Sequence, residues 1–156
     1  MTDAVSNRLA ELDIRLPEPA APVAAYVPAV EIAGLLYISG QLPFREDGSL
    51  ITGTLGLDQG LEQGQEAAKR CAVMLIAQIK KALGSLDRVE RIVKLGAFVA
   101  SDAGFTDQPK VANGASELME RVFGEAGRHA RSAVGVPVLP LGAAVEIDAI
   151  VAVKAG

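Results

Sequence analysis

Two segments of this chain are apolar at every position, and they constrain the fold more than any other feature of the sequence. They are the run Leu35-Leu36-Tyr37-Ile38 and residues 149–153. Successive side chains of a β-strand point to opposite faces of the sheet. Because both segments are apolar on both faces, a sheet built from them needs cover on each side.

The spacing of apolar residues predicts the remaining elements of a single domain that spans residues 1–156, with a helical extension at 1–20. Asp58 is the expected N-cap of the longest helix, and Gly84 is expected to end it. Strands follow from alternating or continuous apolar runs. The expected elements are a short helix at 6–12, a hairpin within 24–39, a helix at 58–83, a strand at 91–100, a helix at 107–123, and strands at 130–136 and 143–153.

This order predicts an α+β fold, a mixed β-sheet with two helices packed on one face. Two helices can cover only one face of a sheet whose strands are apolar on both. The other face is most simply buried by another copy of the same chain. We therefore expect an obligate oligomer.

Composition excludes several classes of function. The chain carries 15 Lys and Arg against 19 Asp and Glu, a net charge of -4, which is the wrong sign for binding phosphate backbones. The N-terminal segment is charged, and no uncharged run reaches the length of a membrane span. We expect no nucleic-acid partner, no membrane association and a cytoplasmic location. Cys71, the only cysteine, lies on the apolar side of the long helix and is expected in the core.

The last two strands hold the best candidates for chemistry, Arg131 and Glu146. If these strands form an antiparallel hairpin centred between Val138 and Leu139, the two residues lie directly opposite each other. One interpretation is a salt bridge that only fixes strand register. The other is a guanidinium that binds an anion, beside a carboxylate that handles a proton or a water molecule. The sequence leaves both open.

Other catalytic arrangements find little support. His129 is the only histidine, and neither Ser39 nor Ser132 lies in a nucleophile-elbow motif. We interpret His129 as a partly buried or loop histidine rather than a catalytic base. One histidine, one cysteine and scattered carboxylates do not form a metal site, and no glycine-rich phosphate loop leads from a strand into a helix. We expect no metal and no cofactor.

Several short motifs, in order, resemble the reactive intermediate deaminase (Rid) family, also called YjgF-like or endoribonuclease L-PSP-like. The resemblance runs from about Tyr26 to the end of the chain, and the chain is similar to a divergent, longer branch. The motifs that carry it are Ser-Gly-Gln at 39–41, Ala-Arg-Ser at 130–132, Leu-Pro at 139–140 and Val-Glu-Ile-Asp-Ala-Ile at 145–150.

The resemblance implies a chorismate-mutase-like fold, a homotrimer with a cleft between each pair of subunits, and cofactor-independent hydrolysis of reactive enamines and imines to 2-keto acids and ammonia. It implies that Arg131 binds the carboxylate of a small metabolite and that Glu146 orients the attacking water. The other residues that it places at the cleft are Tyr26, Ser39, Gly40, Asn113 and Ala133.

The sequence departs from the family pattern at three places. Ala24-Ala25-Tyr26 replaces the usual Gly-Pro-Tyr, His129 stands where proline is common, and Ala133 stands where cysteine is often found. Two other functions stay open. One is a trimer that binds carboxylate metabolites without turnover. The other is an endoribonuclease, which the acidic charge and the few aromatic residues disfavour.

Overall fold

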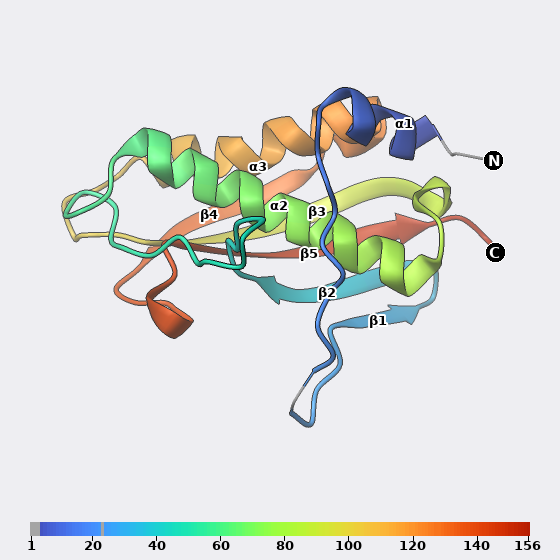
Figure 1. Ribbon diagram of the computed structural model, residues 1–156, viewed down its shortest axis with the longest axis horizontal. Coiled ribbons are helices and arrows are strands. Elements are labelled where there is room, and N and C mark those ends of the chain that lie inside the picture. The colour runs from blue at the N-terminus through green and yellow to red at the C-terminus, as the bar shows by residue number, and fades with distance from the viewer. Residues whose placement is uncertain (1–3, 23) are drawn as a thin grey trace.

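The computed structural model describes residues 4–22 and 24–156, which form one five-stranded sheet with helices on one side (Figure 1). Short 3-10 turns follow α2, α3 and β4, at Leu86–Arg88, Gly124–Gly127 and Pro140–Gly142. The elements are α1 (Ala4–Glu11), β1 (Ala29–Ile32), β2 (Leu35–Gln41), α2 (Leu61–Leu83), β3 (Val89–Ala100), α3 (Gln108–Phe123), β4 (Ala130–Val136) and β5 (Val145–Val153).

The sheet is mixed, with the strand order β1-β2-β5-β3-β4. β4 is the only parallel neighbour among the described pairs and runs beside β3, while the other three pairs are antiparallel. α3 connects β3 to β4, as a parallel pair requires a long crossover. The α+β class, the mixed sheet and the β1–β2 hairpin that turns at Ala33-Gly34 are confirmed.

The core lies between the sheet and the pair α2 and α3, which contact each other along their lengths (Figure 1). Apolar stripes on these helices meet the alternate residues of β5 that point toward them, such as Val145, Ile147 and Val151. α1 is a third helix and packs against α3. Cys71 is fully buried in this core, as expected.

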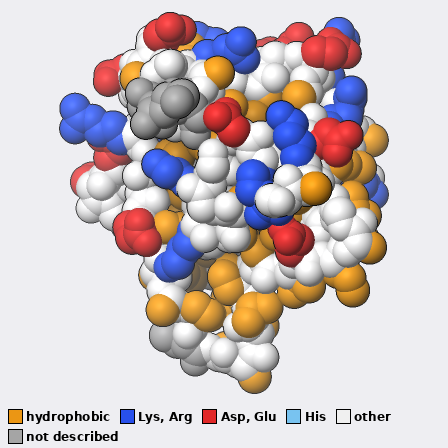
Figure 2. All heavy atoms as spheres, turned by 90° about the vertical axis from the view of Figure 1, so that its right-hand side faces the viewer, with side chains coloured by type: hydrophobic (Ala, Val, Ile, Leu, Met, Phe, Trp, Pro, Cys, Tyr) orange, Lys and Arg blue, Asp and Glu red, His pale blue; other side chains and the backbone are white. Residues whose placement is uncertain are grey.

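The opposite face of the sheet, which we call the open face, has no helix over it in the described part of the chain. Tyr37 and Val134 are exposed there at 44% and 46%, and with Phe98 and Ile150 they line a shallow cavity. Hydrophobic side chains also gather around β1 and the segment before it, at the lower end of the molecule (Figure 2). The chain therefore leaves a large apolar surface uncovered.

Two local expectations are wrong. Gly60 is the N-cap of α2, and Asp58 instead accepts a hydrogen bond from the Thr54 amide at 2.6 Å. The last two strands do not form a hairpin either. In the sheet, β3 lies between β4 and β5. The segment that connects β4 to β5 along the chain crosses the end of the sheet, where Ala143 pairs with Thr52.

No helix in residues 4–22 and 24–156 is long and apolar enough to cross a membrane.

Candidate functional site

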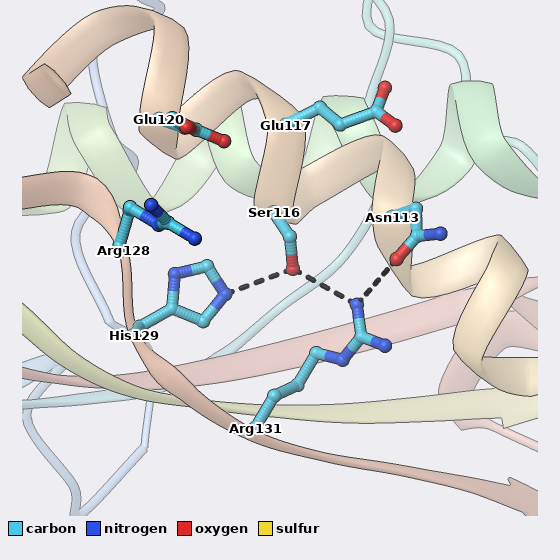
Figure 3. A pocket seen from close by; sticks show the side chains of 7 residues that line it. All are labelled: Asn113, Ser116, Glu117, Glu120, Arg128, His129 and Arg131. Carbon is cyan, nitrogen blue, oxygen red and sulfur yellow. Dashed lines mark hydrogen bonds between the residues drawn. The ribbon is translucent and has the colours of Figure 1, made fainter. Parts of the chain in front are cut away.

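Arg131 lies near the start of the edge strand β4 and points toward α3. Its Nη1 donates to Asn113 Oδ1 at 2.9 Å and to Ser116 Oγ at 3.1 Å (Figure 3). Asn113 and Ser116 are three residues apart on α3 and therefore lie on the same side of the helix. Within residues 4–22 and 24–156, no group accepts a hydrogen bond from Nε or Nη2 of Arg131. That edge of the guanidinium is available to a ligand.

His129 joins the same group of side chains. Its Nε2 lies 2.9 Å from Ser116 Oγ, and its Nδ1 lies 2.7 Å from the carbonyl oxygen of Gly127 (Figure 3). Burial lowers the pKa of His129, and the charge of Arg131 lowers it further, although the hydrogen bond to Gly127 acts in the opposite direction. We call Asn113, Ser116, His129 and Arg131 the Arg131 cluster.

The Arg131 cluster lines an open cleft of about 510 Å³ between α3 and the start of β4. Glu117 and Glu120 of α3 and Arg128 complete its wall (Figure 3). These three side chains are exposed to solvent, whereas Arg131 and His129 are half-buried. The cleft thus has polar, solvent-accessible walls and contains the Arg131 guanidinium, which Asn113 and Ser116 fix by hydrogen bonds. Such a cleft suits a small charged ligand.

Glu146 lies on β5, next to an irregularity in β2. The register between β2 and β5 shifts between Ile38 and Gln41, so the strand bulges at Ser39 and Gly40. The Glu146 side chain packs against Gly40 so closely that a Cβ there would come within 2.8 Å of Glu146 Cδ. Burial, with a smaller contribution from the charge of Asp148, raises the pKa of Glu146. A carboxylate with a raised pKa is suited to accept and return a proton.

Ser39, Gly40 and Tyr26 line a second cleft, of about 270 Å³, beside the segment before β1. The Ser39 amide donates to the Pro28 carbonyl at 2.9 Å, and its hydroxyl donates to the Val27 carbonyl at 3.3 Å. Glu146 is not among the residues that line this cleft, whose wall also includes Met74 and Gln78 of α2. We call the contacting pair Gly40 and Glu146 the Glu146 cluster.

Within one chain, Arg131 and Glu146 are not paired, which corrects the expected cross-strand contact. In the strand register, Arg131 pairs with Leu95 of β3, and Leu95 pairs with Ala149 of β5. The side chains of these three residues therefore point to the same face of the sheet, the one that α2 and α3 cover. Glu146 is three residues from Ala149 and therefore points to the open face. The structure therefore places Arg131 and Glu146 on opposite faces of the sheet.

Ala133 follows Arg131 by two residues on β4 and lies on the same, helix-covered face, where it packs against the core. It contributes no hydrogen-bonding group to the Arg131 cluster.

Sequence reasoning missed Ser116, although its position three residues after Asn113 was a usable signal. It also gave His129 no role, whereas the structure places the ring in contact with Ser116.

In the described part of the chain, no three His, Cys, Asp or Glu side chains are grouped so that they could hold a metal ion. Metal-independent activity stays a prediction.

The fold is that of a chorismate-mutase-like α+β protein, with Arg131 and Glu146 on opposite faces of its sheet, and comparison with known proteins gives the family. A family model described as "YjgF/chorismate mutase-like, putative endoribonuclease" matches residues 6–151. The chain belongs to this YjgF/Rid family, as the motifs predicted.

Three proteins illustrate the similarity. "Protein TCP17" of Trypanosoma cruzi is 52% identical over 94% of this chain and 92% of its own length. A crystal structure of a protein of unknown function from Agrobacterium tumefaciens is 47% identical, with a TM-score of 0.90, over 97% of this chain and 95% of its own. The "2-iminobutanoate/2-iminopropanoate deaminase" of Dermatophagoides farinae is 27% identical over 85% of this chain and 89% of its own length.

Proposed function

We propose that this protein hydrolyses small enamines and imines that carry a carboxylate, yielding 2-keto acids and ammonia without a cofactor, at clefts between the subunits of a homotrimer. The observation that carries the proposal is the guanidinium of Arg131. Asn113 and Ser116 hold its Nη1, so that Nε and Nη2, on the side away from α3 (Figure 3), present a planar pair of donors to a ligand. Such a pair matches the two oxygens of a carboxylate.

The reaction needs little more than this anchor, because an imine carbon is already electrophilic. Glu146, as its carboxylate, would take a proton from a water molecule while the water oxygen forms a bond to the imine carbon. Glu146 returns this proton to the imine nitrogen, which gives a carbinolamine. The carbinolamine hydroxyl then passes its proton to the nitrogen by way of Glu146 as the C–N bond breaks, which releases ammonia and leaves the carbonyl of the 2-keto acid. Its raised pKa makes the Glu146 carboxylate a better proton acceptor than an ordinary glutamate, which supports such proton transfer.

The two clusters supply these roles only if two chains contribute to one site, because Arg131 and Glu146 point to opposite faces of a single sheet. A second copy that packs on the open face would bring its own edge strand toward the first chain's Glu146 cluster. The uncovered apolar residues of that face support such packing.

The activity named for the Dermatophagoides farinae relative also supports the proposal. Its name describes deamination of 2-iminobutanoate and 2-iminopropanoate, which are small imines with a carboxylate next to the reacting carbon.

The direct test is release of ammonia and 2-keto acid from 2-aminoacrylate generated in the assay by a separate enzyme. Turnover above the spontaneous rate in the native protein, lost in Arg131→Ala, is the expected result. Saturable binding of a 2-keto acid without turnover would instead favour a carboxylate-binding protein. Cleavage of RNA that is unaffected by Arg131→Ala would contradict the proposal.

A further inference from the structure

We infer that His129 is a positioning residue, which acts through the Ser116 hydroxyl to hold the Arg131 guanidinium in the orientation that receives a carboxylate. The inference rests on the proposed function for the identity of the ligand. It concerns His129 and Ser116, to which the comparisons assign no role.

The hydrogen bonds fix the tautomer of His129. The Gly127 carbonyl can only accept, so the ring nitrogen that faces it at 2.7 Å, Nδ1, must carry a proton. Burial and the nearby charge of Arg131 both favour the neutral ring. In a neutral imidazole with its proton on Nδ1, Nε2 is an acceptor.

The direction of the next hydrogen bond follows from this tautomer. Ser116 Oγ lies 2.9 Å from His129 Nε2 and 3.1 Å from Arg131 Nη1. Because Nε2 accepts, the Ser116 hydroxyl donates to His129 and turns an oxygen lone pair toward Arg131, which can only donate. The chain of donors therefore runs from Arg131 through Ser116 to His129 and ends at the Gly127 carbonyl.

This chain determines how the guanidinium is presented. Nη1 carries two protons, and Asn113 Oδ1 and Ser116 Oγ accept one each. A guanidinium is planar, so two fixed bonds at Nη1 define the plane and leave the Nε–Nη2 edge facing away from α3 (Figure 3). Holding this edge in place before binding lowers the entropy lost when a carboxylate docks.

Without His129, the Ser116 hydroxyl has other ways to point. It could donate to a backbone carbonyl of its own helix, as serines in helices do, and would no longer present its lone pair steadily to Nη1. The carboxylates in the cleft, Glu117 and Glu120, would then be free to draw the guanidinium away from its position.

Four variants test the inference. The quantity measured is the affinity for pyruvate, a simple 2-keto acid, and NMR titration gives its value for each variant. Ser116→Ala and His129→Phe should each weaken binding about tenfold, the loss expected for one hydrogen bond. His129→Gln should recover most of the affinity, because its amide oxygen can accept from Ser116. The double variant Ser116→Ala/His129→Phe should bind no more weakly than either single variant, because His129 acts only through Ser116.

Glu125→Gln is the matched control. Glu125 lies close to the cluster, where it forms an exposed ion pair with Arg128 at 3.8 Å, and its change should leave pyruvate affinity unaltered. Additive losses in the double variant, or equal losses in His129→Gln and His129→Phe, would overturn the inference by showing that His129 acts separately or only as packing.

A second measurement does not depend on any ligand. The Nε–H resonance of Arg131, assigned by its absence in Arg131→Lys, should be sharp in the native protein and in His129→Gln, and broadened in Ser116→Ala and His129→Phe. An unchanged resonance in all four proteins would overturn the inference. Failure of the proposed function looks different, since the native protein would then show neither turnover nor pyruvate binding while this resonance still responded to the variants.

Discussion

Arg131 is held by α3 rather than by another strand. Its contacts to Asn113 and Ser116 fix one end of the guanidinium, and no carboxylate of the described chain pairs with it. The salt bridge to Glu146, one of the two interpretations that the sequence allowed, does not form within the chain. Ligand binding by Arg131 can therefore be changed by mutation without breaking a salt bridge that stabilises the fold.

Replacing Arg131 by lysine should reduce imine hydrolysis about a hundredfold, because an ammonium keeps the charge but loses the planar pair of donors. The melting temperature should move by only a few degrees, since the side chain is half-buried and lines an open cleft. Steady-state release of 2-keto acid and a thermal melt on the same preparation check both parts. Native turnover in the lysine variant would show that charge alone is sufficient.

Glu146 should lower stability at neutral pH while serving catalysis. Burial raises its pKa above the value in the unfolded chain, so the folded state holds the proton more tightly. Stability is then lost as pH rises from the ordinary glutamate range through the raised folded pKa. Glu146→Gln should accordingly melt at a higher temperature than the native protein at neutral pH, with the difference vanishing in acid, and should have a much lower kcat.

Thermal melts from acid to neutral pH at one protein concentration measure this effect. A variant that is equally destabilised at every pH would mean that the glutamate makes a contact that the amide cannot replace.

At the scale of elements, the site depends on how closely α2 and α3 approach each other. Gly114 of α3 lies directly against the backbone carbonyl of Gln65, and Gln65 Nε2 donates to the Lys110 carbonyl at 3.0 Å. A Cβ at Gly114 would collide with α2. The position of α3, and with it Asn113 and Ser116, is therefore set by a glycine on its inner side.

Gly114→Ala should lower the free energy of unfolding by about 1–3 kcal/mol, the usual cost of overpacking, despite the better helix propensity of alanine. By shifting α3 it should also weaken pyruvate binding. Chemical denaturation and the NMR titration measure the two effects. Gly60→Ala, at the N-cap of α2 where a Cβ meets open space, is the matched control and should change both only slightly. A stable Gly114→Ala protein would show that the helices can separate without cost.

The sequence was sufficient for elements whose signals are local. The apolar stripes of α2 and α3, the turn at Ala33-Gly34 and the apolar run of β5 each predict one element from neighbouring residues. The position of β4 is not local. A strand that precedes a proline-containing segment fits a hairpin with β5 equally well. Only the preceding strand and helix, β3 and α3, indicated a parallel crossover.

The residues of the candidate site also differ in whether local sequence indicates them. Arg131, Glu146, Ser39 and Gly40 could be named as candidates because they belong to short motifs, whereas the bulge at Ser39 and Gly40 was not predicted. The link between His129 and Ser116 could not be predicted, because it depends on the 3-10 turn Gly124–Gly127, which brings the Gly127 carbonyl to the imidazole.

For the whole molecule, the open face predicts assembly. Tyr37, Phe98, Val134 and Ile150 form an apolar surface that no described element covers. We expect a homotrimer in solution at micromolar concentration, which multi-angle light scattering would detect as three times the mass of the 16.2 kDa chain. A charged substitution on this face at the edge strand β4, Val134→Asp, should dissociate the trimer and abolish turnover. A monodisperse native monomer would contradict both the assembly and a site shared between subunits.

The placement of Arg131 and Glu146 on opposite faces of one sheet has a genetic consequence: two inactive alleles should complement each other. In a hybrid trimer of Arg131→Lys and Glu146→Gln chains, one of the three clefts receives the intact arginine from one chain and the intact glutamate from its neighbour. Random mixing of equal amounts makes about three quarters of the trimers hybrid, so co-expression should restore roughly one quarter of native activity. A protein whose two residues met within one chain would show no such rescue.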